Sequence, residues 1–298
     1  MVRHDPGWSE VGAGIFTRRE GALDVAVTAI VGPGGVVVVD CLADPLAGAA
    51  LASDLTALSE QPLAAVVLTH AHYDHTFGLG GLLAEARAGA QGVAVVAHAG
   101  LGAHVPAFEE PELAAGRRGD LALAVEGLWD DVVLPVPDVE VATRTSLVLG
   151  GRTIELWPLA PAHTTCDLLV HVPDAGVWIV GDVVEESGPP NVETDSDLWG
   201  WAVALEQLVT RLGPRDVVVP GHGAPVDREF VARQSAELRQ VADTLREAHG
   251  TGLSQREAVP RLRAATGWPA GTLRAAAAAG FARLAEQGEP GENAGPSL

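Results

Sequence analysis

Thr69-His70-Ala71-His72-Tyr73-Asp74-His75 is the stretch of sequence that says most about this protein. It directly follows Leu63–Leu68, a short continuous apolar run that is typical of a strand buried on both faces. The two alternating histidines point to the same side of an extended segment, so both imidazoles can reach one metal ion. Asp74 and His75 turn into a following helix and can face a second ion about 3.5–4 Å from the first. The stretch therefore predicts a two-metal centre at the carboxyl end of a strand.

Short apolar strands and helices alternate on both sides of this stretch. Val25–Val31 and Val36–Val39 are rich in β-branched residues, and Pro33-Gly34-Gly35 between them predicts a β-hairpin. Strands separated by helices in this way predict an α/β (α+β) fold of two sheets packed face to face and covered by helices. Further strands are expected at Gly92–Ala97, Thr145–Leu149, Thr153–Leu159, Leu168–Val172, Val177–Val180 and Asp216–Val219, and helices at Pro45–Leu58, Gly80–Ala88, 106–130 and Leu198–Leu212.

The pattern changes after residue 226. Residues 227–287 carry Ala, Arg, Glu and Leu at helical spacing and predict an α-helical C-terminal extension. Residues 288–298 are rich in Gly, Pro and Glu and predict a disordered tail. The arginines of the extension have the spacing of a solvated helical face, and the alternative is that the helices cover a cleft or form a dimer contact. These arginines are Arg256, Arg261, Arg263, Arg274 and Arg283.

Composition excludes several classes of protein. The 298 residues include 39 acidic and 19 basic side chains, for a net charge of −20, and every basic one is arginine. A chain without lysine has neither a P-loop lysine nor a Schiff-base lysine, and its negative charge disfavours nucleic-acid binding. Cys41 and Cys166 cannot build a disulfide framework, and no apolar run reaches membrane length. Because the first residues contain no apolar stretch, we expect no secretory signal. We therefore expect a cytoplasmic protein that binds neither nucleic acid nor membrane.

The motif that begins at His70 resembles the His-x-His-x-Asp-His signature of the metallo-β-lactamase superfamily, and the resemblance extends over about residues 11–225. It implies a four-layer αββα sandwich of two mixed sheets, with metals in a cleft at one edge. It also implies three later ligands, which this sequence supplies as His163 in Pro161-Ala162-His163, Asp182 in Val180-Gly181-Asp182 and His222 in Pro220-Gly221-His222. Residues 1–226 are then the metallo-β-lactamase-like domain.

The resemblance also assigns the ligands. His70, His72 and His163 hold the first metal, Asp74, His75 and His222 hold the second, and Asp182 bridges the two. Two zinc ions per chain are expected because imidazole and carboxylate ligands suit zinc, with iron and manganese left open. Asp40 matches a family aspartate that supports the metal-bearing loop. Cys41 and Cys166 are interpreted as packing residues.

A two-zinc centre of this kind implies hydrolysis by a metal-bridged hydroxide, with Asp74 orienting it or relaying its proton. We expect a binuclear hydrolase acting on an ester, thioester, lactone or amide bond of a small molecule. Asp182 makes the chain more similar to the glyoxalase II and lactonase branches than to true β-lactamases. Alternatives are a mononuclear iron persulfide dioxygenase, a β-lactamase or a nuclease. A homodimer is possible, and Tyr73, Trp199 and Trp201 are the candidate substrate contacts.

Overall fold

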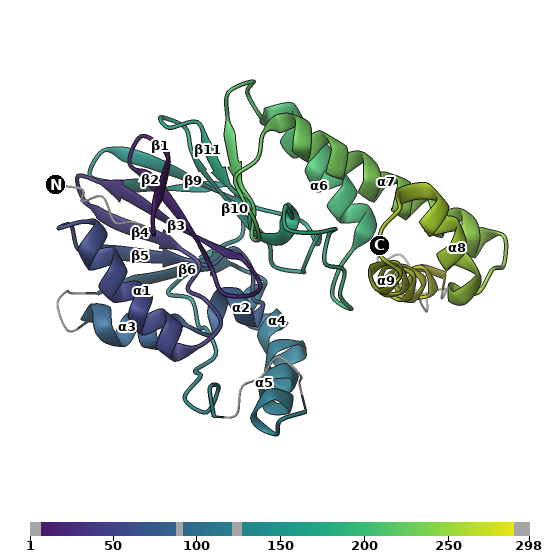
Figure 1. The fold of residues 1–298 in the computed structure, drawn as a ribbon, viewed down its shortest axis with the longest axis horizontal. Helices are drawn as coiled ribbons and strands as arrows, with labels where there is room; N and C mark the ends of the chain where they lie inside the picture. Colours follow the sequence, from purple (N-terminus) through teal and green to yellow (C-terminus); the bar gives the residue numbers. More distant parts are fainter. Residues whose placement is uncertain (1–6, 88–91, 121–126, 289–298) are drawn as a thin grey trace, which may run out of the picture.

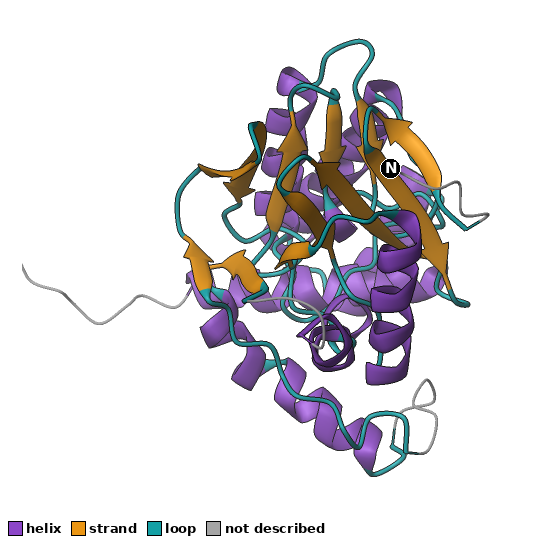
Figure 2. Ribbon diagram, turned by 90° about the vertical axis from the view of Figure 1, so that its left-hand side faces the viewer, coloured by secondary structure: helices purple, strands orange, loops and turns teal. Residues whose placement is uncertain are grey.

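Two mixed β-sheets lie face to face in the computed structural model, with helices on their outer sides (Figure 1). The structure describes residues 7–87, 92–120 and 127–288. Figure 2 shows the strands grouped in the upper half of the molecule, with helices around and below them. This arrangement is the αββα sandwich that the sequence predicts, so that prediction is confirmed.

The first sheet contains seven strands within the described residues, and they follow one another in chain order. The first four pair antiparallel and the last four pair parallel, and the predicted hairpin is the antiparallel pair of β3 and β4. The strands are β1 (Ser9–Gly12), β2 (Ile15–Glu20), β3 (Val25–Gly32), β4 (Gly35–Val39), β5 (Leu63–Val67), β6 (Ala94–His98) and β7 (Val139–Val141).

The second sheet has five strands in the described part of the chain, in the order β12-β11-β10-β9-β8. Only β11 and β12 pair parallel, and the other neighbours are antiparallel. The strands are β8 (Thr145–Leu149), β9 (Arg152–Pro158), β10 (Leu168–Val172), β11 (Val177–Ile179) and β12 (Val217–Val219).

Alternation along β4 shows how the layers form. Val37 and Val39 join the apolar cluster between the two sheets, whereas Val36 and Val38 join the cluster that the first sheet makes with its covering helices. Because all four are buried, the strand carries no polar position, as expected for a strand covered on both faces. The helices are α1 (Pro45–Leu58), α2 (Tyr73–Thr76), α3 (Leu79–Arg87), α4 (Leu101–Ala107), α5 (Glu109–Arg117), the 3-10 helix η1 (Gly181–Val183), α6 (Leu198–Arg211), α7 (Arg228–Gly250), α8 (Gln255–Thr266) and α9 (Ala270–Gly288).

The prediction of one helix over 106–130 is wrong. The chain forms α4 and then α5, with Phe108 between them, and residues 121–126 lie outside the described residues. Pro111 explains the restart, because a proline in the first turn of a helix leaves no intrahelical hydrogen bond unmade. Within this range, the side chain of Glu109 is completely buried.

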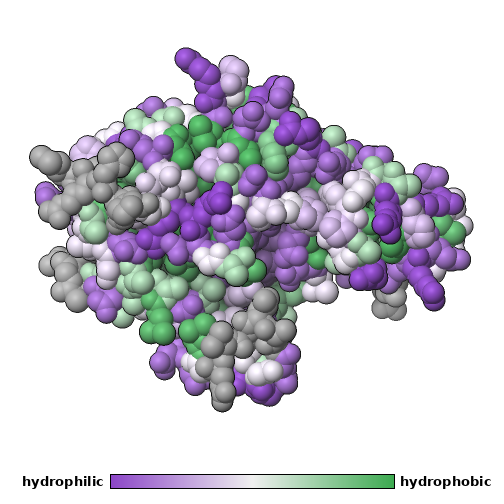
Figure 3. Space-filling view, in the orientation of Figure 1, coloured by the Kyte–Doolittle hydropathy of each residue, from purple (hydrophilic) through white to green (hydrophobic). Residues whose placement is uncertain are grey.

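The helices predicted after residue 226 are α7, α8 and α9, which lie to the right in Figure 1. They share one apolar cluster with α6 and the outer face of the second sheet. Four of the predicted surface arginines, Arg256, Arg261, Arg263 and Arg274, are exposed, and hydrophilic colours predominate over this part of the surface in Figure 3. Residues 289–298 of the predicted tail lie outside the described residues. None of the described helices has both the length and the apolar composition needed to cross a bilayer.

Candidate metal centre

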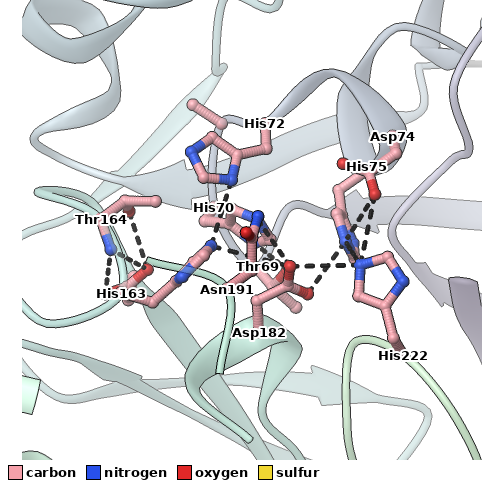
Figure 4. A network of polar contacts seen from close by, with 12 residues as sticks. Thr69, His70, His72, Asp74, His75, His163, Thr164, Asp182, Asn191 and His222 are labelled. Atoms are coloured by element: carbon pink, nitrogen blue, oxygen red, sulfur yellow. Dashed lines mark hydrogen bonds and ion pairs between the residues drawn. The ribbon is translucent and has the colours of Figure 1, made fainter. Parts of the chain in front are cut away.

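All seven predicted ligands lie together at one edge of the two sheets (Figure 4). They come from four separate segments, each of which follows a strand. The segment after β5 carries four of them, and the segments after β9, β11 and β12 carry one each. Each of the seven residues is at most 8% exposed. The seven residues are His70, His72, Asp74, His75, His163, Asp182 and His222.

Three imidazoles and one carboxylate form the first cluster, in which the potential ligand atoms all lie within 4.8 Å of one another. His163 Nε2 lies 3.1 Å from His72 Nδ1 and 3.6 Å from Asp182 Oδ2. His70 Nε2 lies 3.9 Å from the same carboxylate oxygen. These spacings match those between neighbouring ligands of a single small cation, which are about 3–4 Å for bonds of about 2 Å.

The second cluster consists of Asp74, His75 and His222. His222 Nε2 lies 3.2 Å from Asp74 Oδ2 and 3.4 Å from His75 Nε2. Asp182 reaches this cluster as well, because its Oδ1 lies 3.0 Å from His75 Nε2 and its Oδ2 lies 3.2 Å from His222 Nε2. Figure 4 shows Asp182 between the two groups of imidazoles, the position that a bridging carboxylate needs.

Hydrogen bonds on the outer side of each ring decide which nitrogen faces the centre. The Thr69 hydroxyl donates to Asp40, so His70 donates from Nδ1 to that hydroxyl oxygen at 3.0 Å and keeps a lone pair on Nε2. His75 donates from Nδ1 to Asp40 Oδ2 at 2.9 Å, and His222 donates from Nδ1 to Leu23 O at 2.7 Å. Each of these three rings therefore directs Nε2 inward, as partners of this kind do around metal-binding histidines.

The donor set fits a pair of zinc-like cations. His70 Nε2 is buried and has no hydrogen-bond partner within the described residues, which leaves its lone pair unused. Two pairs of ring nitrogens also face each other at 3.1 and 3.4 Å, an arrangement that a shared cation stabilises. Imidazole and carboxylate are ligands that zinc accepts, and five histidines with two aspartates supply enough of them for two ions.

Asp40 holds the loop that carries the first four ligands. Its Oδ1 accepts a hydrogen bond from Thr69 N, and its Oδ2 accepts one from the Thr69 hydroxyl, both at 2.8 Å. Its backbone has a φ of 65°, a left-handed conformation in which aspartate is tolerated better than most residues. Asp40 is not in either ligand cluster, so it supports the loop as the family resemblance implies.

The pKa is lowered for some histidines of the centre and raised for others. Burial and the neighbouring His72 lower the pKa of His163 to about 4, and burial with His75 lowers the pKa of His70. Burial also opposes protonation of His72, but the hydrogen bond that His72 donates to Asp195, together with the charges of Asp195 and nearby glutamates, outweighs it and raises the pKa to about 10. For His222, Asp182 and Asp74 outweigh burial and raise the pKa to about 12. At neutral pH the metal-free centre therefore contains both neutral and protonated imidazoles.

These shifts predict that zinc binding releases protons. His72 and His222 are protonated at pH 7 in the metal-free protein and must each lose a proton to become ligands. Because a metal competes with protons for these nitrogens, we expect the apparent zinc affinity to rise with pH over about pH 6–8. Isothermal titration calorimetry in buffers of different ionisation enthalpy measures the number released, and we expect more than one per chain. A binding heat that does not depend on the buffer would contradict this prediction.

Gly221 leaves the space that Asp182 occupies. A Cβ at this position would lie 1.8 Å from Asp182 Oδ1, which is too close for two non-bonded atoms. We therefore expect Gly221→Ala to displace the carboxylate and to weaken zinc binding by about 10–100-fold, which competition with a chelator can measure. Gly188→Ala is the matched control, because nothing lies within 4 Å of a Cβ there. Equal zinc affinity in the two variants would show that zinc binding does not depend on the space that Gly221 leaves for the Asp182 carboxylate.

The three candidate substrate contacts have different surroundings. Tyr73 is partly buried and packs against Phe77 and Trp129. Trp201 is completely buried, packs its ring 5.1 Å from that of His163 and donates from Nε1 to Val183 O. We propose that Trp201 supports the His163 ring, since no surface of it is free to meet a substrate. Trp199 lies beneath Arg246, whose guanidinium is 5.3 Å from its ring.

The two cysteines are buried and free, as their interpretation as packing residues requires. The Cys41 thiol donates to His75 O at 3.1 Å, and burial with the charge of Asp40 raises its pKa well above the usual value. Burial with Asp167 raises the pKa of the Cys166 thiol as well. Both thiols therefore stay protonated at neutral pH and are not nucleophiles.

Sequence reasoning did not find Asp195, which lies 3.3 Å from His72 Nε2 through its Oδ2. In that contact His72 donates from Nε2 to Asp195, which directs Nδ1 into the first cluster, the reverse of the other rings. Two more buried residues beside it, His104 and Glu109, were also missed. A lone histidine and a first-turn glutamate on short helices carry no sequence signal that separates them from ordinary helix residues.

An αββα sandwich with clustered histidines and aspartates at one sheet edge defines a class of metal-binding proteins. The chain belongs to the metallo-beta-lactamase superfamily, whose sequence model matches residues 21–222. Members of this superfamily are mostly metal-dependent hydrolases.

Three relatives illustrate the similarity. The metallo-beta-lactamase type 2 of Bacillus sp. (strain 170) is 26% identical over 165 residues, which are 55% of this chain and 52% of that protein. The fold matches the stereoselective inverting sec-alkylsulfatase Pisa1 from Pseudomonas sp. with a TM-score of 0.74 and 22% identity, over 98% of this chain and 52% of that one. The fold also matches the metallo-beta-lactamase FIM-1 from Pseudomonas aeruginosa in its mono-zinc form, with a TM-score of 0.60 and 18% identity. This match covers 78% of this chain and 94% of that one. The chain spans about half or less of the curated relatives it matches.

Proposed function

We propose that this protein is a zinc-dependent hydrolase with two metal ions per chain. The observation that carries the proposal is the position of Asp182, which lies within 3.2 Å of His75 and His222 in one cluster and 3.6 Å of His163 in the other. One carboxylate shared by two sets of ligands is the arrangement of a two-metal site. Zinc is the proposed metal because it accepts these ligands, and FIM-1 is described in a mono-zinc form.

In this proposal, His70, His72 and His163 hold one ion, Asp74, His75 and His222 hold the other, and Asp182 joins them. When bound, the two ions lower the pKa of a shared water toward 7 and polarise the bond that is cleaved. Asp74 has one oxygen 3.2 Å from His222 Nε2, so its other oxygen is left to orient the attacking water or accept its proton. The buried positions of these side chains restrict the water that reaches them.

The proposed substrate is a small molecule with an ester, thioester, lactone or amide bond. A secondary alkyl sulfate joins this group because of the fold shared with the sec-alkylsulfatase Pisa1. The net charge of −20 disfavours nucleic acid as a substrate. We also propose a cytoplasmic location, which suits two free buried cysteines, and a chain that acts as a monomer or homodimer.

The direct test combines metal analysis with a substrate panel. Zinc is measured by mass spectrometry after gentle purification, and turnover is measured on a lactone, a thioester, an ester, a β-lactam and a secondary alkyl sulfate. We expect about two zinc ions in the proposed centre and turnover that disappears with a chelator and returns with zinc. Less than one metal per chain together with no metal-dependent turnover would contradict the proposal.

A mononuclear iron enzyme is the second candidate, and one observation favours it. The first cluster alone offers three imidazoles and a carboxylate, which also suit a single iron. Iron as the isolated metal, with oxygen uptake that depends on a persulfide, would support this candidate. Zinc with hydrolysis of any panel substrate excludes it.

A further inference from the structure

A second group of possible ligands lies next to His72 but outside the proposed two-metal centre. His104 on α4 and Glu109 at the start of α5 form one group of possible ligands with His72, and Asp195 in the loop before α6 forms another with His72 and Glu193. His104, Glu109 and Asp195 are all buried, and His104 and Glu109 are at most 1% exposed. The prediction of one helix over 106–130 gave no reason to expect buried ligands here.

Two spacings around His104 match those between ligands of one metal ion. His104 Nε2 lies 3.4 Å from Glu109 Oε1 and 3.6 Å from Asp195 Oδ2. Ligands bound tetrahedrally to zinc at about 2.0–2.2 Å are separated by about 3.3–3.6 Å, so the observed distances are close to the required ones. His104 Nδ1 contacts the Thr165 hydroxyl at 2.8 Å, and this contact orients Nε2 toward the two carboxylates.

Three buried polar atoms of this group have no hydrogen bond within the described residues. Neither Glu109 oxygen has a hydrogen bond in the described structure, and His104 Nε2 has none either. The ion pairs found for Glu109 and Asp195 within the described residues involve histidines only. A buried carboxylate is normally hydrogen-bonded, paired with a cation or bound to a metal. A cation between His104 and Glu109 would satisfy all three of the unpartnered atoms.

We propose that His104, Glu109 and Asp195 form a third cation site, which takes a zinc-like divalent metal ion. Its ligands are His104 Nε2, the Glu109 carboxylate and Asp195 Oδ2. Asp195 also contacts His72 Nε2 at 3.3 Å, so it connects the third site to the first cluster through the His72 ring. A metal on Asp195 would draw charge from the carboxylate that orients His72, and the two sites would influence each other.

One of the three proposed ligands lines a cavity. Asp195 lines a cavity of about 190 Å³ together with Phe108, Thr165 and Arg283, the last of which comes from α9. Phe108 and Thr165 flank His104 in this wall, since its ring lies 4.7 Å from that of Phe108. The cavity therefore reaches Asp195, and two residues that contact His104, from the side of the C-terminal helices.

Zinc stoichiometry of the full chain tests the proposal. The protein is freed of metal, titrated with zinc, desalted and analysed by mass spectrometry. We expect the unaltered chain to retain one more zinc ion than Glu109→Gln, which keeps the size of the side chain and removes its charge. Glu110→Gln is the matched control, because Glu110 is the exposed neighbour, and it should retain as much zinc as the unaltered chain. Equal zinc in all three proteins would overturn the third site.

A second measurement uses only the unaltered chain and stays decisive if the variant does not fold. Crystals grown with zinc are measured at the zinc absorption edge, and we expect an anomalous peak within about 2.5 Å of His104 Nε2. A map without that peak overturns the third site, because the group then serves only to hold His72. Peaks beside His70 and His222 report separately on the two-metal centre, so the failure of one proposal is distinguishable from the failure of the other.

Discussion

Asp182→Asn is expected to remove most of the zinc from the two-metal centre and to lower turnover by about 10³-fold or more. Asp182 is the one carboxylate in the ion pairs of the described residues that contacts histidines of both clusters, namely His70, His163, His75 and His222. Although burial opposes its charge, the surrounding histidines hold the pKa of Asp182 well below the usual value, so it is a carboxylate at neutral pH. Asparagine keeps the shape of the side chain and removes the charge that two cations share.

The measurement is zinc content and kcat/KM on whichever panel substrate the unaltered enzyme turns over, with thermal unfolding as the check on folding. Asp131→Asn is the matched control, because Asp131 is exposed, and it should change neither quantity. If Asp182→Asn kept both its zinc and its turnover, the shared carboxylate would not be what holds the centre together.

The part of the site that could be predicted from the sequence is the part encoded locally. Thr69 to His75 follow a buried strand, so strand periodicity alone places alternate imidazoles on one side. The three distant ligands could not be obtained that way. His163, Asp182 and His222 were assigned by family resemblance, because no local pattern says that the ends of β9, β11 and β12 meet the end of β5.

The elements of the fold that could be predicted are likewise those that a local sequence pattern encodes. Strands such as β4 and β5 were predictable because burial on both faces leaves a continuous apolar run in the sequence. The break between α4 and α5 was not, because apolar and charged residues continue across it and only Pro111 marks the new first turn. The buried positions of Glu109 and Asp195 depend on how that break turns α5 against the loop before α6, which is a property of the tertiary structure.

The supporting residues show why the site needs more than its ligands. Asp40 is distant in the sequence from His75, and Leu23 is distant from His222. Each nevertheless accepts a hydrogen bond that fixes which nitrogen of its histidine points inward. A sequence motif specifies the residue type at a position, whereas a hydrogen bond to a residue distant in the sequence specifies the orientation of the side chain. For this reason the ligand list was predictable and the geometry was not.

Asp74→Ala is expected to lower turnover by about 10²–10⁴-fold while leaving zinc in the first cluster. Asp74 lies 3.2 Å from His222 Nε2 and 3.8 Å from His75 Nε2, and neither of these histidines belongs to the first cluster. The variant loses one ligand of the second ion and the carboxylate that orients the water, whereas Asp182 and three histidines still surround the first ion.

The distinction between Asp74→Ala and Asp182→Asn is the informative result, because the two carboxylates are both buried within the same centre but serve it differently. Asp74→Ala should lose only the second zinc ion, whereas Asp182→Asn should lose more zinc. We also expect the zinc-loaded Asp182→Asn variant to have the lower melting temperature of the two. Asp131→Ala, at an exposed position, controls for the loss of a carboxylate as such. Full turnover in Asp74→Ala would remove Asp74 from the catalytic step, and complete loss of zinc would mean that the two clusters bind their ions as one unit.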